Sequence, residues 1–262
     1  MIVVRSLLFN LIFYLVTAIM LVATLPIFFF LSQENAVRVV RDWAATCVWL
    51  YRWIAATSLE VRGAENIPKG AALVASKHQS SFETFALIPL LRNPTIVMKR
   101  VIRWFPIFGP YTIKTGMIHV DRDGKTAALR ALSERAREEI AKGRQIIIFP
   151  EGTRRPPGAP PAYQTGIALL YRTLNVPVVP VAVNSGVYWP RRKFLRYPGT
   201  IVIEFLPPIP PGLDSRAFLT RLQATIETAS DRLLAEAFIK RRELHVELLG
   251  DQTLGVTELR VK

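Results

Sequence analysis

Residues 6–33 carry no charged side chain, and most of them are Leu, Ile, Val or Phe. As a helix this segment would be roughly 40 Å long at 1.5 Å per residue, whereas the hydrocarbon layer of a bilayer is about 30 Å thick. A signal peptide would have a shorter apolar region followed by a small-residue cleavage site, and a core helix would show a polar stripe. The segment therefore predicts a membrane-inserted helix. Whether that helix crosses the whole bilayer stays open.

A second, amphipathic helix is predicted after a polar turn at residues 32–35, whose side chains can cap it. Apolar side chains recur at helical spacing over residues 37–54, with arginines elsewhere on the wheel. Trp43, Trp49 and Trp53 lie among them, and tryptophan beside arginine is typical of the lipid headgroup level. Central burial of one arginine would cost about 2.5–3.5 kcal/mol, so this helix is expected at the interface, antiparallel to the first. A core-facing amphipathic helix is the alternative.

Charge and cysteine content narrow the possible partners. The formal net charge is +14, so the expected partners are anionic, and both nucleic acid and an anionic membrane fit. The charges are scattered among apolar segments without a recognised nucleic-acid module, so no nucleic-acid partner is expected. Cys47 is the only cysteine, and no Cys/His cluster has metal-ligand spacing. No metal is therefore expected, and the composition is consistent with a domain that faces a reducing cytoplasm.

Beyond Gly63 the pattern becomes that of a soluble α/β domain. Short apolar runs bounded by turn signals predict buried strands at residues 71–75, 96–98, 117–120, 146–149, 178–183 and 201–205. Helices are predicted at residues 126–142, 166–174 and 215 to about 242, the first of them ending at a glycine. The expected organisation is a membrane-anchoring helical pair over residues 1–58, an α/β domain over residues 59–243, and a tail over residues 244–262 with no assigned function.

His78 and Glu83 form the first candidate site. On one ideal helix, residues five apart lie about 140° from each other. The two side chains can therefore meet only if His78 lies in a loop and Glu83 in the first turns of a helix, with Ser80 or Ser81 as its cap. A carboxylate on one ring nitrogen leaves the other free to accept a proton and stabilises the imidazolium. The pair is a candidate general base, and a solvated or core histidine is the alternative.

The second candidate site is the sharp turn at residues 150–155, where a predicted strand ends. Gly152 would let the backbone approach a ligand closely, and the Arg154 guanidinium can hold a phosphate through two charge-assisted hydrogen bonds. Lys99 and Arg122 follow other predicted strands. Ligands of open α/β sheets collect at the carboxyl ends of strands, so these cations are expected beside the histidine. Taken alone, each of these cations could simply be a charged residue at the end of a strand, without a binding role.

Four motifs in this order resemble those of the glycerolipid acyltransferase family, in particular members of bacterial type that acylate lysophosphatidate. The family's His-x4-Asp appears as His78 and Glu83, its Gly-x-hydrophobic-x-hydrophobic-Asp/Glu-Arg as Gly116 to Asp121-Arg122, its Glu-Gly-Thr-Arg intact at residues 151–154, and its proline-containing apolar run at residues 178–182. The resemblance covers roughly residues 59–205, and the N-terminal helices also match in kind. It implies a single α/β acyltransferase domain with a mixed sheet flanked by helices.

By this resemblance, His78 deprotonates the free hydroxyl of lysophosphatidate, which attacks the thioester of acyl-CoA or acyl carrier protein, while Glu83 orients His78. The residues implied to bind the acceptor phosphate are Arg154, Lys99 and Arg122, with Gly152 and Thr153 in the turn. Glu151 and Asp121 belong to the motifs without a separate role. No metal and no cofactor is implied. The implied partners are the acyl donor, the lysophospholipid and the membrane, with the catalytic domain on the cytoplasmic face of a bacterial inner membrane.

Two positions depart from the family's pattern. Glu83 replaces the usual aspartate and adds one methylene, which a small rotamer adjustment can absorb. Gln164 stands where these enzymes often carry lysine, so an acyltransferase for glycerol-3-phosphate or a lyso-ornithine lipid stays an alternative. A serine hydrolase and a membrane-tethered nucleic-acid binder are alternatives of other classes. The chain has no Gly-x-Ser-x-Gly elbow, which argues against the hydrolase.

Overall fold

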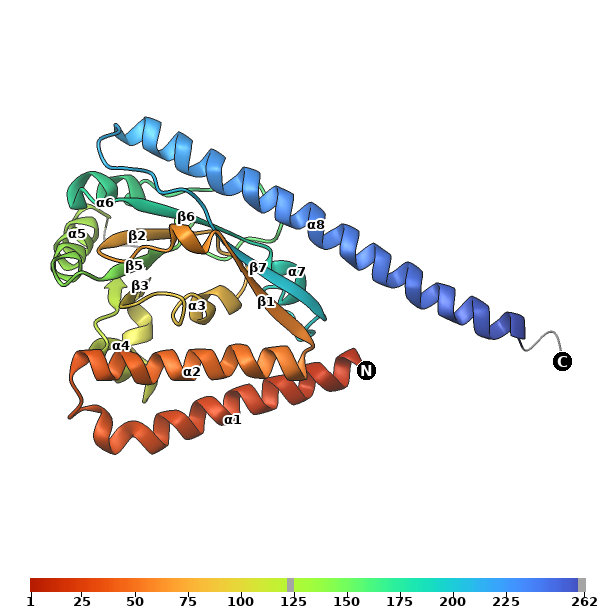
Figure 1. Ribbon diagram of the computed structural model, residues 1–262. Helices are drawn as coiled ribbons and strands as arrows, with labels where there is room; N and C mark the ends of the chain where they lie inside the picture. Colours follow the sequence, from red (N-terminus) through yellow and green to blue (C-terminus); the bar gives the residue numbers. More distant parts are fainter. Residues whose placement is uncertain (122–124, 259–262) are drawn as a thin grey trace.

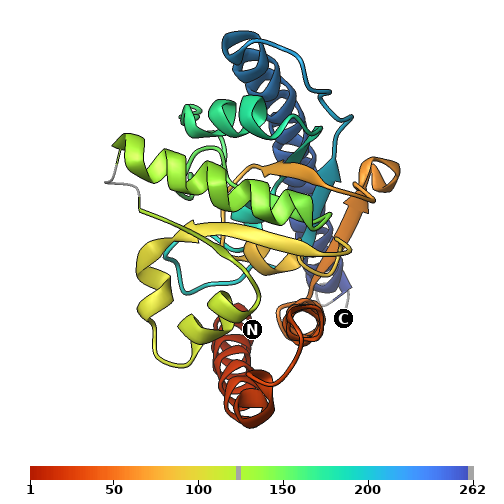
Figure 2. The same ribbon diagram turned by 90° about the vertical axis from the view of Figure 1, so that its left-hand side faces the viewer.

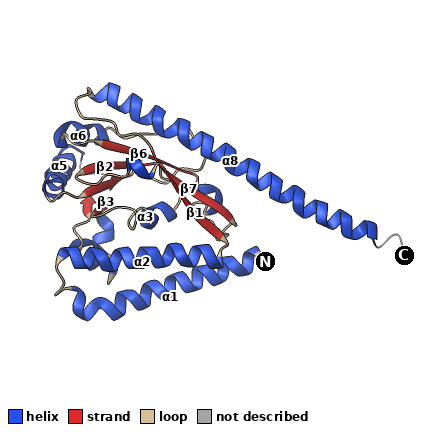
Figure 3. Cartoon of the chain, viewed as in Figure 1, coloured by secondary structure: helices blue, strands red, loops and turns tan. Residues whose placement is uncertain are grey.

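The structure, a computed structural model, describes the backbone of residues 1–121 and 125–258 and the side chains of residues 1–121 and 127–240. A central sheet separates two layers of helices (Figure 1). One layer contains α1 (Ile2–Phe28), α2 (Gln33–Ile54), α3 (Phe82–Ala86) and α4 (Phe108–Lys114). The other contains α5 (Lys125–Ala141), α6 (Gly166–Leu174) and α8 (Ser215–Glu258). Figure 3 separates the helices and strands by colour.

Over the described residues the sheet has seven strands, in the order β1-β7-β6-β2-β5-β3-β4. Their bounds are β1 Thr57–Arg62, β2 Ala72–Ser76, β3 Pro94–Lys99, β4 Ile118–Val120, β5 Gln145–Ile148, β6 Val178–Val183 and β7 Gly199–Phe205. The β6–β7 pair is antiparallel and every other pair is parallel, so the sheet is mixed, as the resemblance implied. The carboxyl ends of β2, β3, β5 and β6 therefore meet at one edge, where ligands of such sheets collect.

The apolar face of α2 is buried against the sheet. Ala44, Cys47 and Tyr51 belong to the same core cluster as strand residues of β2, β6 and β7. The polar turn caps this helix as predicted, because the Ser32 hydroxyl accepts a hydrogen bond from the backbone N–H of Asn35 at 3.3 Å. The apolar face of α2 was expected at the membrane interface, and this expectation is corrected, because that face packs in the protein core as in the alternative reading. Its Trp49 and Trp53 nevertheless stay exposed.

The first helix, α1, is attached to the domain at both ends. Near its start, the backbone N–H of Arg196 donates to the Ser6 hydroxyl at 2.9 Å, and the Arg196 guanidinium donates to Asn10 at 3.0 Å. Near its end, the Tyr111 hydroxyl donates to the carbonyl of Leu21 at 2.6 Å, and the Tyr111 ring stacks on Phe28. The helix therefore runs along the domain, antiparallel to α2 as expected (Figure 1).

The outward side of α1 is apolar. Its exposed large side chains include Leu7, Leu11, Leu15, Ile19 and Val22. Within the part of the chain that the structure describes, α1 is the one helix long and apolar enough to cross a membrane. An exposed apolar surface of this extent marks a membrane or protein contact.

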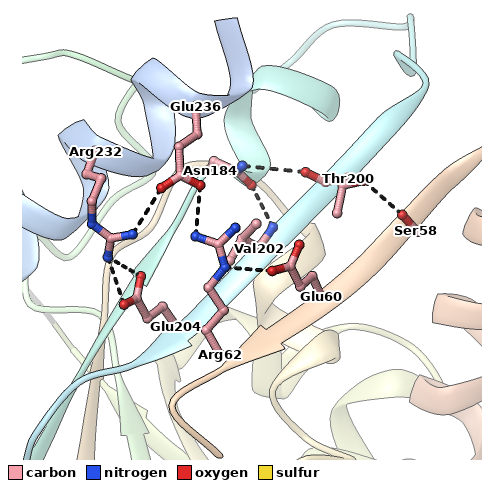
Figure 4. A network of polar contacts seen from close by, with 9 residues as sticks. All are labelled: Ser58, Glu60, Arg62, Asn184, Thr200, Val202, Glu204, Arg232 and Glu236. Carbon is pink, nitrogen blue, oxygen red and sulfur yellow. Dashed lines mark hydrogen bonds and ion pairs between the residues drawn. The ribbon is translucent and has the colours of Figure 1, made fainter. Parts of the chain in front are cut away.

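The helix α8 covers the opposite face of the sheet and continues past the predicted end near residue 242 to Glu258. Ion pairs fasten it to β1 and β7 (Figure 4): Arg62 contacts Glu236 at 2.8 Å, and Arg232 contacts Glu204 at 2.6 Å. These side chains are partly exposed, so each pair contributes at most about 1 kcal/mol. The network fixes where α8 crosses the sheet edge rather than supplying much of the stability.

Candidate active site

His78 lies in the loop after β2, and Glu83 lies in the first turn of α3, which is the placement that lets the two side chains meet. Nδ1 of His78 is 2.9 Å from Oε1 of Glu83. That same oxygen accepts hydrogen bonds from the backbone N–H groups of Gln79 and Ser80, both at 2.7 Å. Glu83 is fully buried. Its carboxylate thus fixes the loop and the imidazole together.

Burial acts to raise the pKa of Glu83, but hydrogen bonds from His78, Ser185 and the backbone of Ser80 outweigh it and hold this pKa below its usual range. Glu83 is therefore ionised at neutral pH. An ionised carboxylate only accepts hydrogen bonds, so the ring must donate through Nδ1–H. That tautomer leaves the Nε2 lone pair of His78 available to take a proton.

The predicted phosphate-binding turn lies beside this histidine. The His78 ring stacks on Phe149 with centroids 4.1 Å apart. Nη1 of Arg154 donates to the Ser81 hydroxyl at 2.6 Å, in the loop between His78 and Glu83. Gly152 has φ of 66°, a left-handed conformation that glycine adopts without strain. The turn and the histidine loop are therefore held against each other.

Both segments line one cavity of about 920 Å³. The predicted site residues that line it are His78, Lys99, Asp121, Glu151, Gly152, Thr153 and Arg154. Asp121 lies 3.6 Å from Arg100 across an exposed ion pair. Arg122 lies outside the described residues. Apart from Arg122 and the buried Glu83 behind the histidine, the structure brings the predicted site residues to a single cavity.

The cavity continues from these polar groups into an apolar space beneath the N-terminal helices. Its apolar lining includes Met20 and Leu21 of α1, Val40 and Trp43 of α2, and Phe85 and Ile88. A ligand that fills the whole cavity would need an anionic end and a long apolar part. The arrangement suits an amphipathic, phosphate-bearing molecule.

Glu151 plays a different part from its neighbours in the turn. Its carboxylate is buried and accepts a hydrogen bond from Nζ of Lys77 at 3.2 Å. The same ammonium group donates to Glu227 of α8 at 2.8 Å. This buried ion cluster ties the turn to α8. Sequence reasoning missed Lys77 because its partners are 74 and 150 residues away along the chain.

Two further cations, Arg191 and Arg192, also line the cavity. Nη1 of Arg191 donates to the backbone carbonyl of Arg154 at 2.8 Å. Burial, together with repulsion from Arg191 and Arg192, lowers the pKa of Arg154. Crowded cations of this kind favour a bound anion. The Arg-Arg-Lys run soon after the strand at residues 178–183 was the signal that could have pointed to them.

Ser185 is a second residue that sequence reasoning missed. It begins α7 (Ser185–Tyr188), and its hydroxyl donates to Oε2 of Glu83 at 2.6 Å. Ser185 is fully buried, and it lies 102 residues from Glu83 in the sequence. It therefore satisfies the carboxylate oxygen that His78 does not contact.

We expect Ser185→Ala to lower the free energy of unfolding by about 1–3 kcal/mol, because a buried carboxylate oxygen loses its donor. The kcat of the variant should fall less than in variants that remove the carboxylate itself. Ser230→Ala is the matched control, since Ser230 is also buried and its hydroxyl has no partner among the described residues. Denaturant unfolding measures the first effect. Equal stability of the two variants would contradict the role given to Ser185.

Comparison with known proteins points in one direction. The family profile described as Acyltransferase matches residues 58–184. The chain is 35% identical over 210 residues to the 1-acyl-sn-glycerol-3-phosphate acyltransferase of Pseudomonas aeruginosa, covering 80% of this chain and 82% of that protein. It is 30% identical over 155 residues to the human 1-acyl-sn-glycerol-3-phosphate acyltransferase alpha, covering 58% of this chain and 55% of that protein.

The fold has a solved counterpart. The crystal structure of the 1-acyl-sn-glycerophosphate acyltransferase PlsC from Thermotoga maritima superposes with a TM-score of 0.73. It covers 89% of this chain and 98% of that chain at 22% sequence identity. The likeness therefore concerns the fold of most of this chain.

Proposed function

The chain belongs to the glycerolipid acyltransferase family, and from that premise we propose that it transfers an acyl group from an acyl thioester to the sn-2 hydroxyl of lysophosphatidate, giving phosphatidate. The observation that carries this proposal is the single cavity that joins the His78–Glu83 pair, the Arg154 turn and a long apolar space. A lysophosphatidate has the matching parts, which are a hydroxyl, a phosphate and a hydrocarbon chain.

In the proposed reaction, the oxygen of the acceptor hydroxyl attacks the thioester carbonyl, and Nε2 of His78 takes the proton of that hydroxyl. Glu83 stabilises the imidazolium that forms. The tetrahedral intermediate collapses, the carbon–sulfur bond breaks, and the leaving thiolate takes the proton from His78. A thioester is already activated, so positioning and proton transfer supply most of the rate acceleration. The proposed scheme needs no acyl-enzyme and no metal.

The remaining cavity residues receive roles that follow from their charge. Arg154 and Lys99 are proposed to hold the acceptor phosphate, with the backbone of Gly152 and Thr153 beside it. Arg191 and Arg192 are added to this group because they line the same cavity. Arg122, from the resemblance, stays a proposal on the sequence alone. The apolar outer side of α1 is proposed to hold the enzyme in the membrane, with the cavity on the cytoplasmic side.

Arg154→Ala is expected to weaken use of the acceptor by about 1.5–3 kcal/mol, because hydrogen bonds to a charged phosphate are lost. That range corresponds to a roughly 10- to 150-fold decrease in kcat/KM for lysophosphatidate. The KM for the acyl donor should change little. Arg137→Ala, which removes an exposed guanidinium from α5, is the control. Acceptor kinetics that match those of the control would remove Arg154 from the phosphate site.

The function itself is tested by a matrix of acceptors and donors. Purified protein is assayed with lysophosphatidate, glycerol-3-phosphate and a lyso-ornithine lipid as acceptors. Each acceptor is tested with acyl-CoA and with acylated acyl carrier protein as the donor. We expect the highest kcat/KM with lysophosphatidate. The lyso-ornithine lipid is included because Gln164, at a position where these enzymes often carry lysine, lines the cavity. A preference for either other acceptor would overturn the proposed substrate.

A further inference from the structure

The connection from β3 to α4 exposes an unusual run of apolar side chains. It contains the short 3-10 helix η2 (Arg100–Trp104) and the loop that follows. Residues 103–107 are all exposed, and the exposed fractions are 71% for Trp104, 52% for Phe105 and 40% for Ile107. Val101 of η2 is 56% exposed. Single exposed apolar residues are ordinary, whereas a contiguous patch marks a contact surface. We call residues 101–107 the exposed apolar loop.

The backbone holds this loop in a defined shape. Ile107 has φ of 62°, which is strained for a β-branched residue. The N–H of Gly109 donates to the carbonyl of Phe105 at 2.8 Å. A Cβ added at Gly109 would lie 2.1 Å from the carbonyl oxygen of Arg103, so only glycine permits this close return of the chain. Backbone strain of this kind is typical of functional segments.

Basic side chains lie at the start of the exposed apolar loop. Lys99, Arg100 and Arg103 are exposed at its start, and Arg103 lies over the Trp104 ring at 5.7 Å. One carboxylate, Asp121, lies 3.6 Å from Arg100. Tryptophan beside arginine is the pairing found where lipid headgroups meet acyl chains, and clustered cations are attracted to anionic lipid. The chemistry of the patch therefore complements an anionic bilayer surface.

The exposed apolar loop leads directly into α4, which contacts the end of α1. Directly after the loop, α4 contacts the end of α1 through Tyr111 and through Lys114, whose ammonium group donates to the carbonyl of Phe29 at 2.9 Å. Phe29 and Phe30, in the turn between α1 and α2, are exposed. Figure 2 shows α4 next to the α1–α2 pair, at the end of the molecule facing the viewer. A bilayer that receives α1 would thus lie close to the loop.

The inner side of the same segment lines the active-site cavity. Ile102 and Phe108 are cavity-lining residues, whereas Trp104 and Phe105 between them are exposed and are not among the residues that line it. We propose that the exposed apolar loop docks on the anionic bilayer as a second membrane contact, separate from α1, and admits the lipid acceptor to the cavity from the bilayer. The docking is argued from the exposed apolar and basic side chains of the loop, whereas the entry of the acceptor also rests on the proposed function.

The docking is tested with a fluorescent probe on the full-length protein. An environment-sensitive thiol label is attached to Phe105→Cys or to Phe238→Cys on α8. Phe238 is a matched site, because it is 56% exposed and belongs to α8, the helix that covers the face of the sheet opposite α1 (Figure 1). Burial raises the pKa of the native Cys47 thiol to about 12, so Cys47 should not react. The unsubstituted chain serves as the labelling blank.

Each labelled protein is reconstituted into vesicles of equal parts phosphatidylglycerol and phosphatidylethanolamine that contain a nitroxide-bearing lipid. The probe at position 105 is expected to shift its emission to the blue and to lose at least half of its intensity to the nitroxide. The probe at position 238 should show neither change. Equal quenching at the two positions would overturn the proposed docking.

Acceptor entry is tested by kinetics. Trp104→Ser/Phe105→Ser is compared with Phe238→Ser/Ile239→Ser on lysophosphatidate in the same vesicles and on a short-chain, monomeric lysophosphatidate. The loop variant is expected to raise the apparent KM at least fivefold for the vesicle acceptor only. Equal losses on both acceptors, or no loss on either, would overturn the entry role. If the unsubstituted protein acylates neither acceptor, the proposed function fails, and the probe still decides the docking.

Discussion

Replacing His78 with alanine is expected to lower kcat by a factor of about 10²–10⁴ or more, because the general base is lost. The fold should survive, since Glu83 keeps its hydrogen bonds to Ser185 and to the backbone of Gln79 and Ser80. The substitution enlarges the existing cavity, and the buried charge of Glu83 keeps its other hydrogen-bond donors. Initial rates with lysophosphatidate and acyl-CoA measure the loss, and the thermal unfolding midpoint checks the fold.

His119→Ala is the control for this experiment. His119 accepts or donates one hydrogen bond at 2.9 Å to Thr112, and it does not line the cavity in the described structure. The control should therefore keep kcat within a few-fold of the unsubstituted enzyme. A His78→Ala variant that retained a tenth or more of the original kcat would show that another group removes the proton.

Glu83→Gln is expected to reduce kcat by about 10²–10⁴ with little change in the KM for the acceptor. The amide has nearly the same shape as the carboxylate, so its oxygen can still accept from His78 and the backbone. It carries no charge, so it cannot stabilise the imidazolium that forms during proton transfer. The measurement is kcat and KM at several pH values, together with the unfolding midpoint.

Glu83→Asp provides the matched comparison, because aspartate is the usual residue of the family at this position. It keeps the charge and shortens the side chain by one methylene. We expect it to retain at least a tenth of the original kcat after a local adjustment of the histidine loop. If the Gln and Asp variants were equally active, the negative charge of Glu83 would have no catalytic role.

Six of the seven strands could be predicted because each is a short apolar run between turn signals. The predicted ends differ from β2–β7 by at most two residues. The missed strand, β1, lies at the sheet edge, and Glu60 and Arg62 interrupt its apolar pattern. Its charged side chains pair with each other and with Glu236 of α8, a contact that no local pattern encodes.

The orientation of α2 could not be predicted from its pattern. An amphipathic helix buries its apolar face equally well in a protein core or in a bilayer, since both are apolar. Long-range packing decides between them, and here Tyr51 donates a hydrogen bond to the carbonyl of Tyr188 at 3.1 Å from within the core. The sequence could show that one face of α2 is apolar, whereas the fold determines what covers it.

Some contacts of the site could likewise be predicted from the sequence, whereas others depend on the fold. His78 and Glu83 are five residues apart, so simple helix geometry predicted how they could meet. Ser185 and Arg191 follow β6, whereas Lys77 and the histidine loop follow β2, and only the sheet order, in which β6 pairs with β2, brings these segments together. Sequence could identify the cations of the Glu-Gly-Thr-Arg turn, but the crowding of Arg191 against Arg154 depends on the folded chain.

The central claim is that Glu83 holds the His78 proton on Nδ1 and leaves Nε2 as the base. It is tested most directly by the ¹⁵N NMR spectrum of histidine-labelled protein in detergent micelles. The chain has three histidines, and His78→Ala identifies the relevant signals. In the neutral ring, we predict a protonated Nδ1 and an unprotonated Nε2. A neutral His78 that carries its proton on Nε2 would contradict the proposed mechanism.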